Sequence, residues 1–76
     1  MKIESIDGVV FTGVDASDIC RQIWRGSFVF DKTFKDWMRI SSYHANQWNG
    51  ALVRTDTAEN HLADLIEYKI YKLLEG

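Results

Sequence analysis

The chain has 76 residues and a mass of 8.8 kDa, which is enough for one domain with a small core. Hydrophobic residues make up 46% and charged residues 26%, a balance typical of globular rather than disordered proteins. Nine basic and eleven acidic side chains give a formal net charge of −2, which disfavours general nucleic-acid affinity but leaves room for a local basic patch.

Several other classes of protein are excluded by what the sequence lacks. The single cysteine, Cys20, excludes an intramolecular disulfide, and one cysteine with His44 and His61 does not make a four-ligand zinc site without carboxylates. The sequence contains no cofactor motif, so we expect neither a metal nor a cofactor. The N-terminal residues have no apolar run typical of a signal peptide, and no run is long enough to span a membrane. We therefore expect a single domain over residues 1–76, located in the cytoplasm.

The first predicted element is a β-hairpin over residues 2–12. Asp7-Gly8 between two β-prone runs is typical of a type I′ turn, in which both central residues take positive φ. This two-residue loop predicts that Ile3 faces Thr12 on the neighbouring strand. Because side chains alternate across a sheet, Phe11 would then lie on the opposite face from Ile3.

Two helices are predicted next. Asp15 is the expected N-cap of the first, which would end at Arg25-Gly26. Residues 27–30 form an apolar connector. The second helix would span about residues 34–48, capped by Asp31 or Thr33, because apolar residues recur there at i, i+3, i+4 spacing.

The C-terminal third combines a short β-prone run with a predicted last helix. Residues 51–55 can add a third strand beside the hairpin, and residues 56–59 have the form of a capping box, with Asp56 as the acceptor. The last helix would bury Leu62, Leu65 and Leu73 on one stripe. The predicted order is β-β-α-α-β-α, a small α+β domain whose hairpin and third strand pack against three helices.

Catalytic chemistry has few candidates in this sequence. Neither His44 nor His61 has a nucleophile or a carboxylate at the local spacing that would make a catalytic pair. Cys20 stands among core-type residues, so we expect it to be a small buried hydrophobe. We therefore expect no catalytic residue and no enzyme activity. The alternative, a small enzyme, requires the fold to bring a partner to one of the two imidazole rings.

The net charge conceals two regions of opposite sign. Residues 21–39 hold five basic and two acidic side chains, a balance of +3, and residues 56–76 hold two basic and five acidic ones, a balance of −3. The basic candidates for partner contact are Arg21, Arg25, Lys35 and Arg39. The acidic and aromatic candidates, expected to lie together on the last helix, are Asp64, Glu67, Tyr68 and Tyr71. An ordinary solvated helix face is the alternative for this second set.

Aromatic residues are more numerous than so small a core can readily hide. The chain has three Trp, three Tyr and four Phe, and aromatic and arginine side chains are typical anchors of protein interfaces. These features predict a non-enzymatic module that binds a larger protein or protein complex.

The alternative is a small nucleic-acid-binding regulator that uses the basic helical face with an exposed Trp. An exposed edge of the hairpin also leaves a homodimer open.

Two stretches of the sequence resemble short phage and prophage proteins of ββααβα type. One is the strand ending in Phe11-Thr12-Gly13 followed by the acid-capped helix up to Trp24, and the other is the closing segment over residues 54–66. The sequence departs from that pattern at Trp24, where those proteins have an aliphatic residue or Met. The resemblance implies a mobile-element origin and a location in the host-cell cytosol. Because small phage proteins include anti-CRISPR inhibitors, it also implies a host defence complex, such as a CRISPR effector, as the partner.

Overall fold

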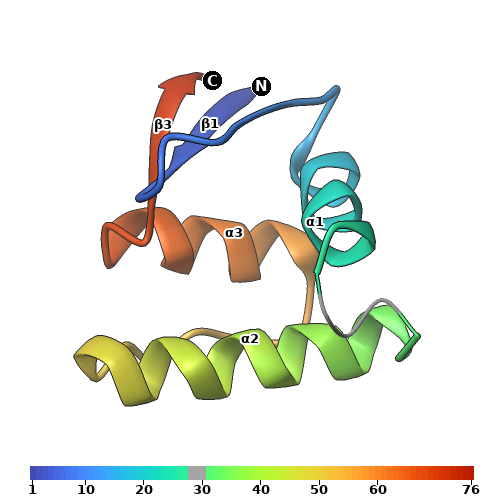
Figure 1. Cartoon of the computed structure of the whole chain (residues 1–76), viewed down its shortest axis with the longest axis vertical. Helices are drawn as coiled ribbons and strands as arrows, with labels where there is room; N and C mark the ends of the chain where they lie inside the picture. Colours follow the sequence, from blue (N-terminus) through green and yellow to red (C-terminus); the bar gives the residue numbers. More distant parts are fainter. Residues whose placement is uncertain (28–30) are drawn as a thin grey trace.

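A three-stranded antiparallel sheet and three helices make up the fold, which the computed structural model describes for residues 1–27 and 31–76 (Figure 1). The elements in chain order are β1 (Lys2–Ser5), β2 (Val10–Thr12), α1 (Ala16–Arg25), α2 (Phe34–Asn49), α3 (Ala58–Glu67) and β3 (Tyr71–Glu75). The predicted α+β class, with a hairpin, a third strand and three helices, is confirmed. Residues 28–30 of the predicted apolar connector lie outside the described residues.

The elements are arranged in layers. Figure 1 shows α3 between the sheet and α2, with α1 standing at one end of both helices. The two chain ends lie side by side, because β1 pairs with β3 and Lys2 faces Glu75. In the part of the chain that is described, no helix combines the length and the apolar character needed to cross a membrane.

The hairpin closes through a three-residue loop, so the predicted two-residue loop is wrong. Gly8 is the last loop residue and has a φ of +86°, and its N–H donates to the Ser5 carbonyl over 3.0 Å. A loop that ends on such a left-handed glycine is a common three-residue hairpin connection. Ile3 therefore pairs with Phe11, one residue away from the predicted register. This shift places Ile3 and Phe11 on the same inner face, against the core.

The helix boundaries follow their caps closely. Asp15 caps α1, with its carboxylate accepting from the Asp18 N–H over 2.9 Å, as predicted. Of the two caps proposed for α2, Thr33 is the one that accepts from the first turn. The predicted cap of α3 is off by one residue, because Thr57 rather than Asp56 fills that position.

The third strand is β3, so the prediction that residues 51–55 form it is wrong. The last helix stops at Glu67, and Lys69, with a φ of +62°, reverses the chain. The Ile70 N–H bonds the Leu65 carbonyl over 2.9 Å and the Lys69 N–H bonds the Ile66 carbonyl over 3.0 Å, the pattern of a Schellman helix end. The chain order is thus β-β-α-α-α-β, and the strand order is β2-β1-β3.

Residues 51–55, here called the clamped segment, lie between α2 and α3. On the α2 side, the Ser42 hydroxyl donates to the Val53 carbonyl over 2.7 Å, and the Asn46 amide donates to the Ala51 carbonyl over 3.2 Å. Both Ala51 and Val53 are buried. Since these backbone carbonyls find partners in helix side chains, the segment can be buried without joining the sheet.

The α3 side of the clamped segment is held at Arg54. The Arg54 N–H donates to the Asp64 carboxylate over 2.9 Å, and the Arg54 carbonyl lies 2.7 Å from Nδ1 of His61. Two side chains of α3 thus take the places that a neighbouring strand would otherwise fill.

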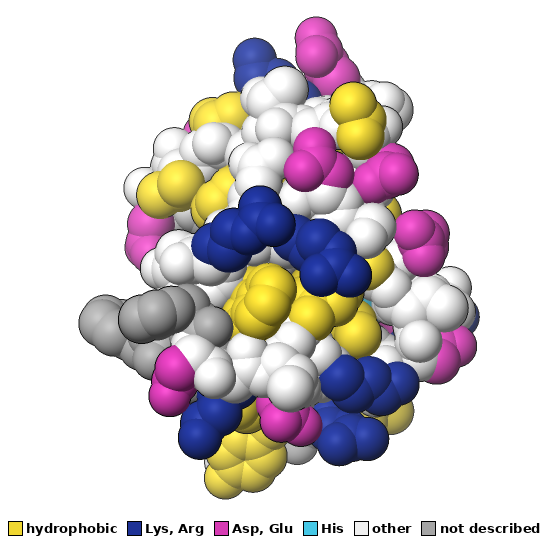
Figure 2. All heavy atoms as spheres, turned by 90° about the vertical axis from the view of Figure 1, so that its right-hand side faces the viewer, with side chains coloured by type: hydrophobic (Ala, Val, Ile, Leu, Met, Phe, Trp, Pro, Cys, Tyr) yellow, Lys and Arg dark blue, Asp and Glu magenta, His cyan; other side chains and the backbone are white. Residues whose placement is uncertain are grey.

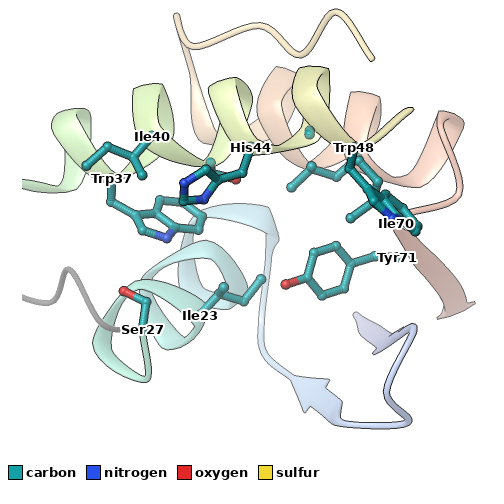
Figure 3. Close-up of a pocket in the computed structure, with 11 residues that line it drawn as sticks. Ile23, Ser27, Trp37, Ile40, His44, Trp48, Ile70 and Tyr71 are labelled. Carbon is teal, nitrogen blue, oxygen red and sulfur yellow. The ribbon is translucent and has the colours of Figure 1, made fainter. Parts of the chain in front are cut away.

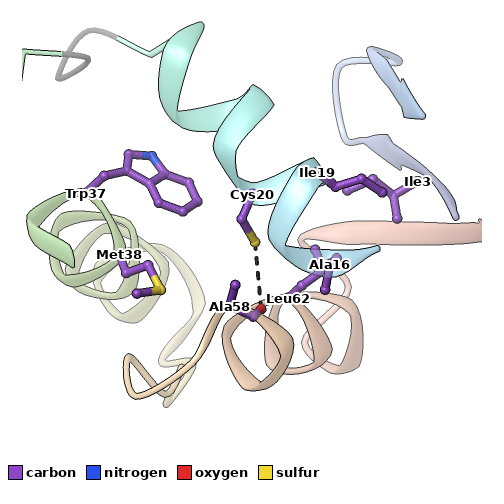
Figure 4. Close-up of a cluster of buried hydrophobic side chains, with 8 residues drawn as sticks. All are labelled: Ile3, Ala16, Ile19, Cys20, Trp37, Met38, Ala58 and Leu62. Atoms are coloured by element: carbon purple, nitrogen blue, oxygen red, sulfur yellow. Dashed lines mark hydrogen bonds between the residues drawn. The ribbon is translucent and has the colours of Figure 1, made fainter. Parts of the chain in front are cut away.

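The main core lies where α1, α2, α3 and β1 meet (Figure 4). Its buried members are Ile3, Ala16, Ile19, Cys20, Trp37, Met38, Ala58 and Leu62. Cys20 is fully buried, and its Sγ lies 3.7 Å from the Ala58 carbonyl. Its predicted role as a small core hydrophobe is confirmed.

Candidate functional site

The four basic residues expected to contact a partner lie on α1 and the N-terminal half of α2. The guanidinium carbon of Arg21 lies 4.3 Å from the centre of the Phe34 ring, which brings α1 against the first turn of α2. Figure 2 shows this side of the molecule, where Lys and Arg side chains gather above and below an apolar area. We call the exposed set the basic face, and its members are Arg21, Arg25, Lys35 and Arg39.

Aromatic rings packed beneath the basic face hold the two helices together. Phe34 stacks on Trp37 with ring centres 5.6 Å apart, and Trp24 contacts Phe34 in a tilted arrangement at the same distance. The indole N–H of Trp24 donates to the Lys32 carbonyl over 3.0 Å. Because these rings pack on each other and on Arg21, they fix the position of the Arg21 guanidinium.

One acid lies within the basic face. Asp36 forms an ion pair with Arg39 over 3.6 Å, and both side chains are about half exposed or more, at 48% and 64%. An exposed pair of this kind is weak and easily exchanged for another partner. Arg25 and Lys35 take part in no ion pair within the described residues.

The acidic and aromatic set does not share one helix face, so that prediction is wrong. Asp64 is only 5% exposed and accepts hydrogen bonds from the Arg54 N–H, Nε and Nη2, each over 2.9 Å. Hydrogen bonding by Arg54 lowers the pKa of Asp64, which keeps this carboxylate charged and engaged. Asp64 is therefore not available to a partner.

The other members of that set are divided between elements because α3 ends at Glu67. Tyr71 lies on β3, half-buried, with its ring edge toward Phe11. Glu67 and Tyr68 remain exposed at the end of α3. Only these two of the four predicted contacts stay next to each other on the surface.

His61 is fully buried and has hydrogen-bond partners on both ring nitrogens. Its Nδ1 lies 2.7 Å from the Arg54 carbonyl and its Nε2 lies 3.1 Å from the Ser41 hydroxyl. Since a carbonyl can only accept, Nδ1 carries the proton and Nε2 accepts from Ser41. Burial lowers the pKa of His61, which favours this neutral form.

The Ser41–His61 pair has the nucleophile and base of a serine hydrolase, and local spacing did not reveal it because the residues are twenty apart in sequence. Ser41 lies in the middle of α2, where the backbone N–H groups bond within the helix and cannot form an oxyanion hole. His61 is buried against Trp37, with ring centres 5.3 Å apart, so a substrate cannot reach its imidazole. The pair therefore joins α2, α3 and the clamped segment.

The described residues offer neither a metal-binding cluster nor a reactive thiol. No group of three or more His, Cys, Asp or Glu side chains there could hold a metal ion. Burial, with a smaller contribution from Glu59, raises the pKa of Cys20 to about 12, so the reactive thiolate is suppressed at neutral pH.

Comparisons with protein-family models, with curated proteins and with solved structures found no match.

Proposed function

We propose that the protein is a non-enzymatic binding module that docks its basic face on an acidic surface of a larger protein. The observation that carries this proposal is the joining of two separate basic pairs. Arg21 and Arg25 of α1 and Lys35 and Arg39 of α2 are all exposed, and their two helices meet where the Arg21 guanidinium covers the Phe34 ring. A rigid domain with such a face can block a partner's surface without chemistry of its own.

A protein partner fits the aromatic layer better than a nucleic acid does. Base stacking needs free ring faces, but Phe34 is covered by Arg21 and Trp37, and Trp24 packs on Phe34. Nucleic acid remains the second candidate because exposed Lys and Arg side chains can neutralise the charges of a phosphate backbone.

The likeness of the sequence to short phage proteins supplies a setting for this proposal. In that setting the partner is a host defence complex of the CRISPR-effector type, and the protein acts in the host-cell cytosol as an inhibitor. An acidic protein surface of such a complex is the target that the basic face would cover.

Affinity capture with two matched variants tests the proposal. Arg25→Gln with Lys35→Gln removes two charges from the basic face, and Lys69→Gln with Lys72→Gln removes two exposed charges elsewhere. Each bait is incubated with nuclease-treated bacterial lysate. We expect one partner protein to be retained by the wild type and by the second variant, and to be reduced at least tenfold with the first.

Equal retention by both variants would contradict the proposal, and so would a partner that disappears on nuclease treatment. In the latter case a gel-shift series separates the candidates. Binding to nucleic acid alone, with a steep loss of affinity as salt rises, would favour the second candidate.

A further inference from the structure

An open cavity of about 380 Å³ lies between α1, α2 and the start of β3 (Figure 3). Its buried floor includes Trp37, Ala45 and Leu65, and Trp48 and Tyr71 form part of its walls. Because most of the lining belongs to helices packed on the core, the cavity is formed before any ligand enters. The proposed docking function does not use it.

Polar groups of the described residues point into this cavity. Figure 3 shows the His44 ring and the Tyr71 hydroxyl directed toward the space between the helices and β3. In the part of the chain that is described, the Tyr71 hydroxyl has no hydrogen bond, and the His44 ring has only an aromatic contact with Tyr43, at 5.9 Å. Ser41 also lines the cavity and keeps lone pairs free after donating to His61.

Among the described residues, the cavity lining contains no Asp, Glu, Lys or Arg. A charged ligand would lose hydration there without gaining a counter-charge, so the lining selects against both anions and cations. The rings of Trp37, Trp48 and Tyr71 favour a flat ring that can stack or meet them edge to face.

We propose that this cavity binds a small, uncharged, planar aromatic molecule with a hydrogen-bonding edge. The flat ring lies among the indole and phenol rings, and its polar edge bonds the Tyr71 hydroxyl and the His44 imidazole. A volume of about 380 Å³ is at the small end of ligand pockets, in keeping with one or two rings. For a one-ring probe this predicts a dissociation constant on the order of 1 mM.

Three probes of nearly the same shape test the choice of ligand. Benzamide is uncharged, benzoate is an anion and benzamidine is a cation, and each is titrated into the labelled protein while its amide and indole N–H signals are followed by NMR. We expect benzamide to shift the Trp48 indole signal in a saturable way, and both charged probes to bind at least tenfold more weakly. Equal binding of the three probes, or no shift at 10 mM benzamide, would overturn the proposal.

Two tyrosine variants test the geometry. Tyr71→Phe removes the hydroxyl inside the cavity and keeps the ring, whereas Tyr43→Phe removes an exposed hydroxyl outside it. We expect the first to weaken benzamide binding about fivefold or more and the second to leave it unchanged. Equal affinities would contradict the assigned contact. If Tyr71→Phe does not fold, the selectivity among the three probes decides alone.

The basic-face variant, Arg25→Gln with Lys35→Gln, should bind benzamide like the wild type. A failure of the cavity proposal is therefore separate from a failure of the docking function.

Discussion

His61 uses both ring nitrogens to hold other parts of the chain. One bonds the Arg54 carbonyl and the other receives the Ser41 hydroxyl, and together they join α2, α3 and the clamped segment. The imidazole suits this role because it has one donor and one acceptor when neutral. Protonation would place a donor at Nε2 and bury a charge, which weakens the arrangement.

The first prediction concerns acid stability. The pKa of His61 is lowered from 6.5 in the folded state, so the unfolded state binds the proton more readily. The stability tied to neutral His61 is therefore present above about pH 6.5 and is lost as pH falls below that value toward the lowered pKa. Chemical denaturation at pH 7.5 and pH 5 should show this loss in the wild type and in His44→Gln. In a folded His61→Gln variant the loss should be smaller, and an unchanged pH slope in that variant would contradict the assignment.

Cys20 gives a second prediction at this scale. Its thiol is fully buried against the Ala58 carbonyl, and burial raises its pKa to about 12. We expect the native protein to react with a thiol reagent at pH 8 at least a hundredfold more slowly than the protein unfolded in guanidinium chloride. Similar rates in the two states would show that the thiol is accessible.

At the scale of elements, the end of α3 explains the largest error of sequence reasoning. Helix ends of the Schellman type usually have Gly in the left-handed position, but here that position is Lys69. The apolar spacing of Leu65, Ile70 and Leu73 then suits a longer helix as well as a strand. Without the glycine, nothing in the sequence marked the boundary between α3 and β3.

The third prediction follows from the strained backbone at Lys69. A left-handed conformation costs a residue with a Cβ about 1–2 kcal/mol, part of which glycine recovers. Lys69→Gly should raise the free energy of unfolding by about 0.5–1 kcal/mol after the added flexibility of the unfolded chain is counted. Lys72→Gly, which removes the same side chain within β3, should lower it. Urea denaturation measures both, and a loss of stability in Lys69→Gly would contradict the assigned helix end.

The fourth prediction concerns the clamped segment. Asp64 accepts three hydrogen bonds from Arg54, and Asp64→Asn keeps the shape but removes the charge and one acceptor. We expect this change to lower the free energy of unfolding by about 1–2 kcal/mol. Asp36→Asn, at the exposed ion pair with Arg39, is the matched control and should have little effect. Equal effects of the two changes would show that Asp64 does not hold the segment.

Local signals were sufficient for the class of fold and for the caps of α1 and α2, because Asp15 and Thr33 act within one turn of their own positions. The hairpin register and the clamped segment depend on distant groups. Phe11 pairs with Ile3 because that register places both side chains on the side of the sheet that packs against the core. Residues 51–55 stay outside the sheet because side chains of α2 and α3 bond their backbone groups.

At the scale of the whole molecule, the charge of −2 hides an uneven distribution. The predicted basic set remains exposed on two helices that meet at Arg21 and Phe34, whereas the predicted acidic set is split by the early end of α3 and the burial of Asp64. Sequence spacing could place each basic pair on its own helix but could not show that the two helices meet. That contact depends on Phe34 meeting Arg21 and Trp24.

Lysine footprinting of the captured complex tests the docking claim most directly. Lys35 lies on the basic face, and Lys69 and Lys72 are exposed elsewhere, so one acetylation experiment compares them within the same molecule. We expect the bound partner to slow acetylation of Lys35 at least fivefold and to leave the other two lysines unchanged. Protection of Lys69 and Lys72 with Lys35 still reactive would contradict it.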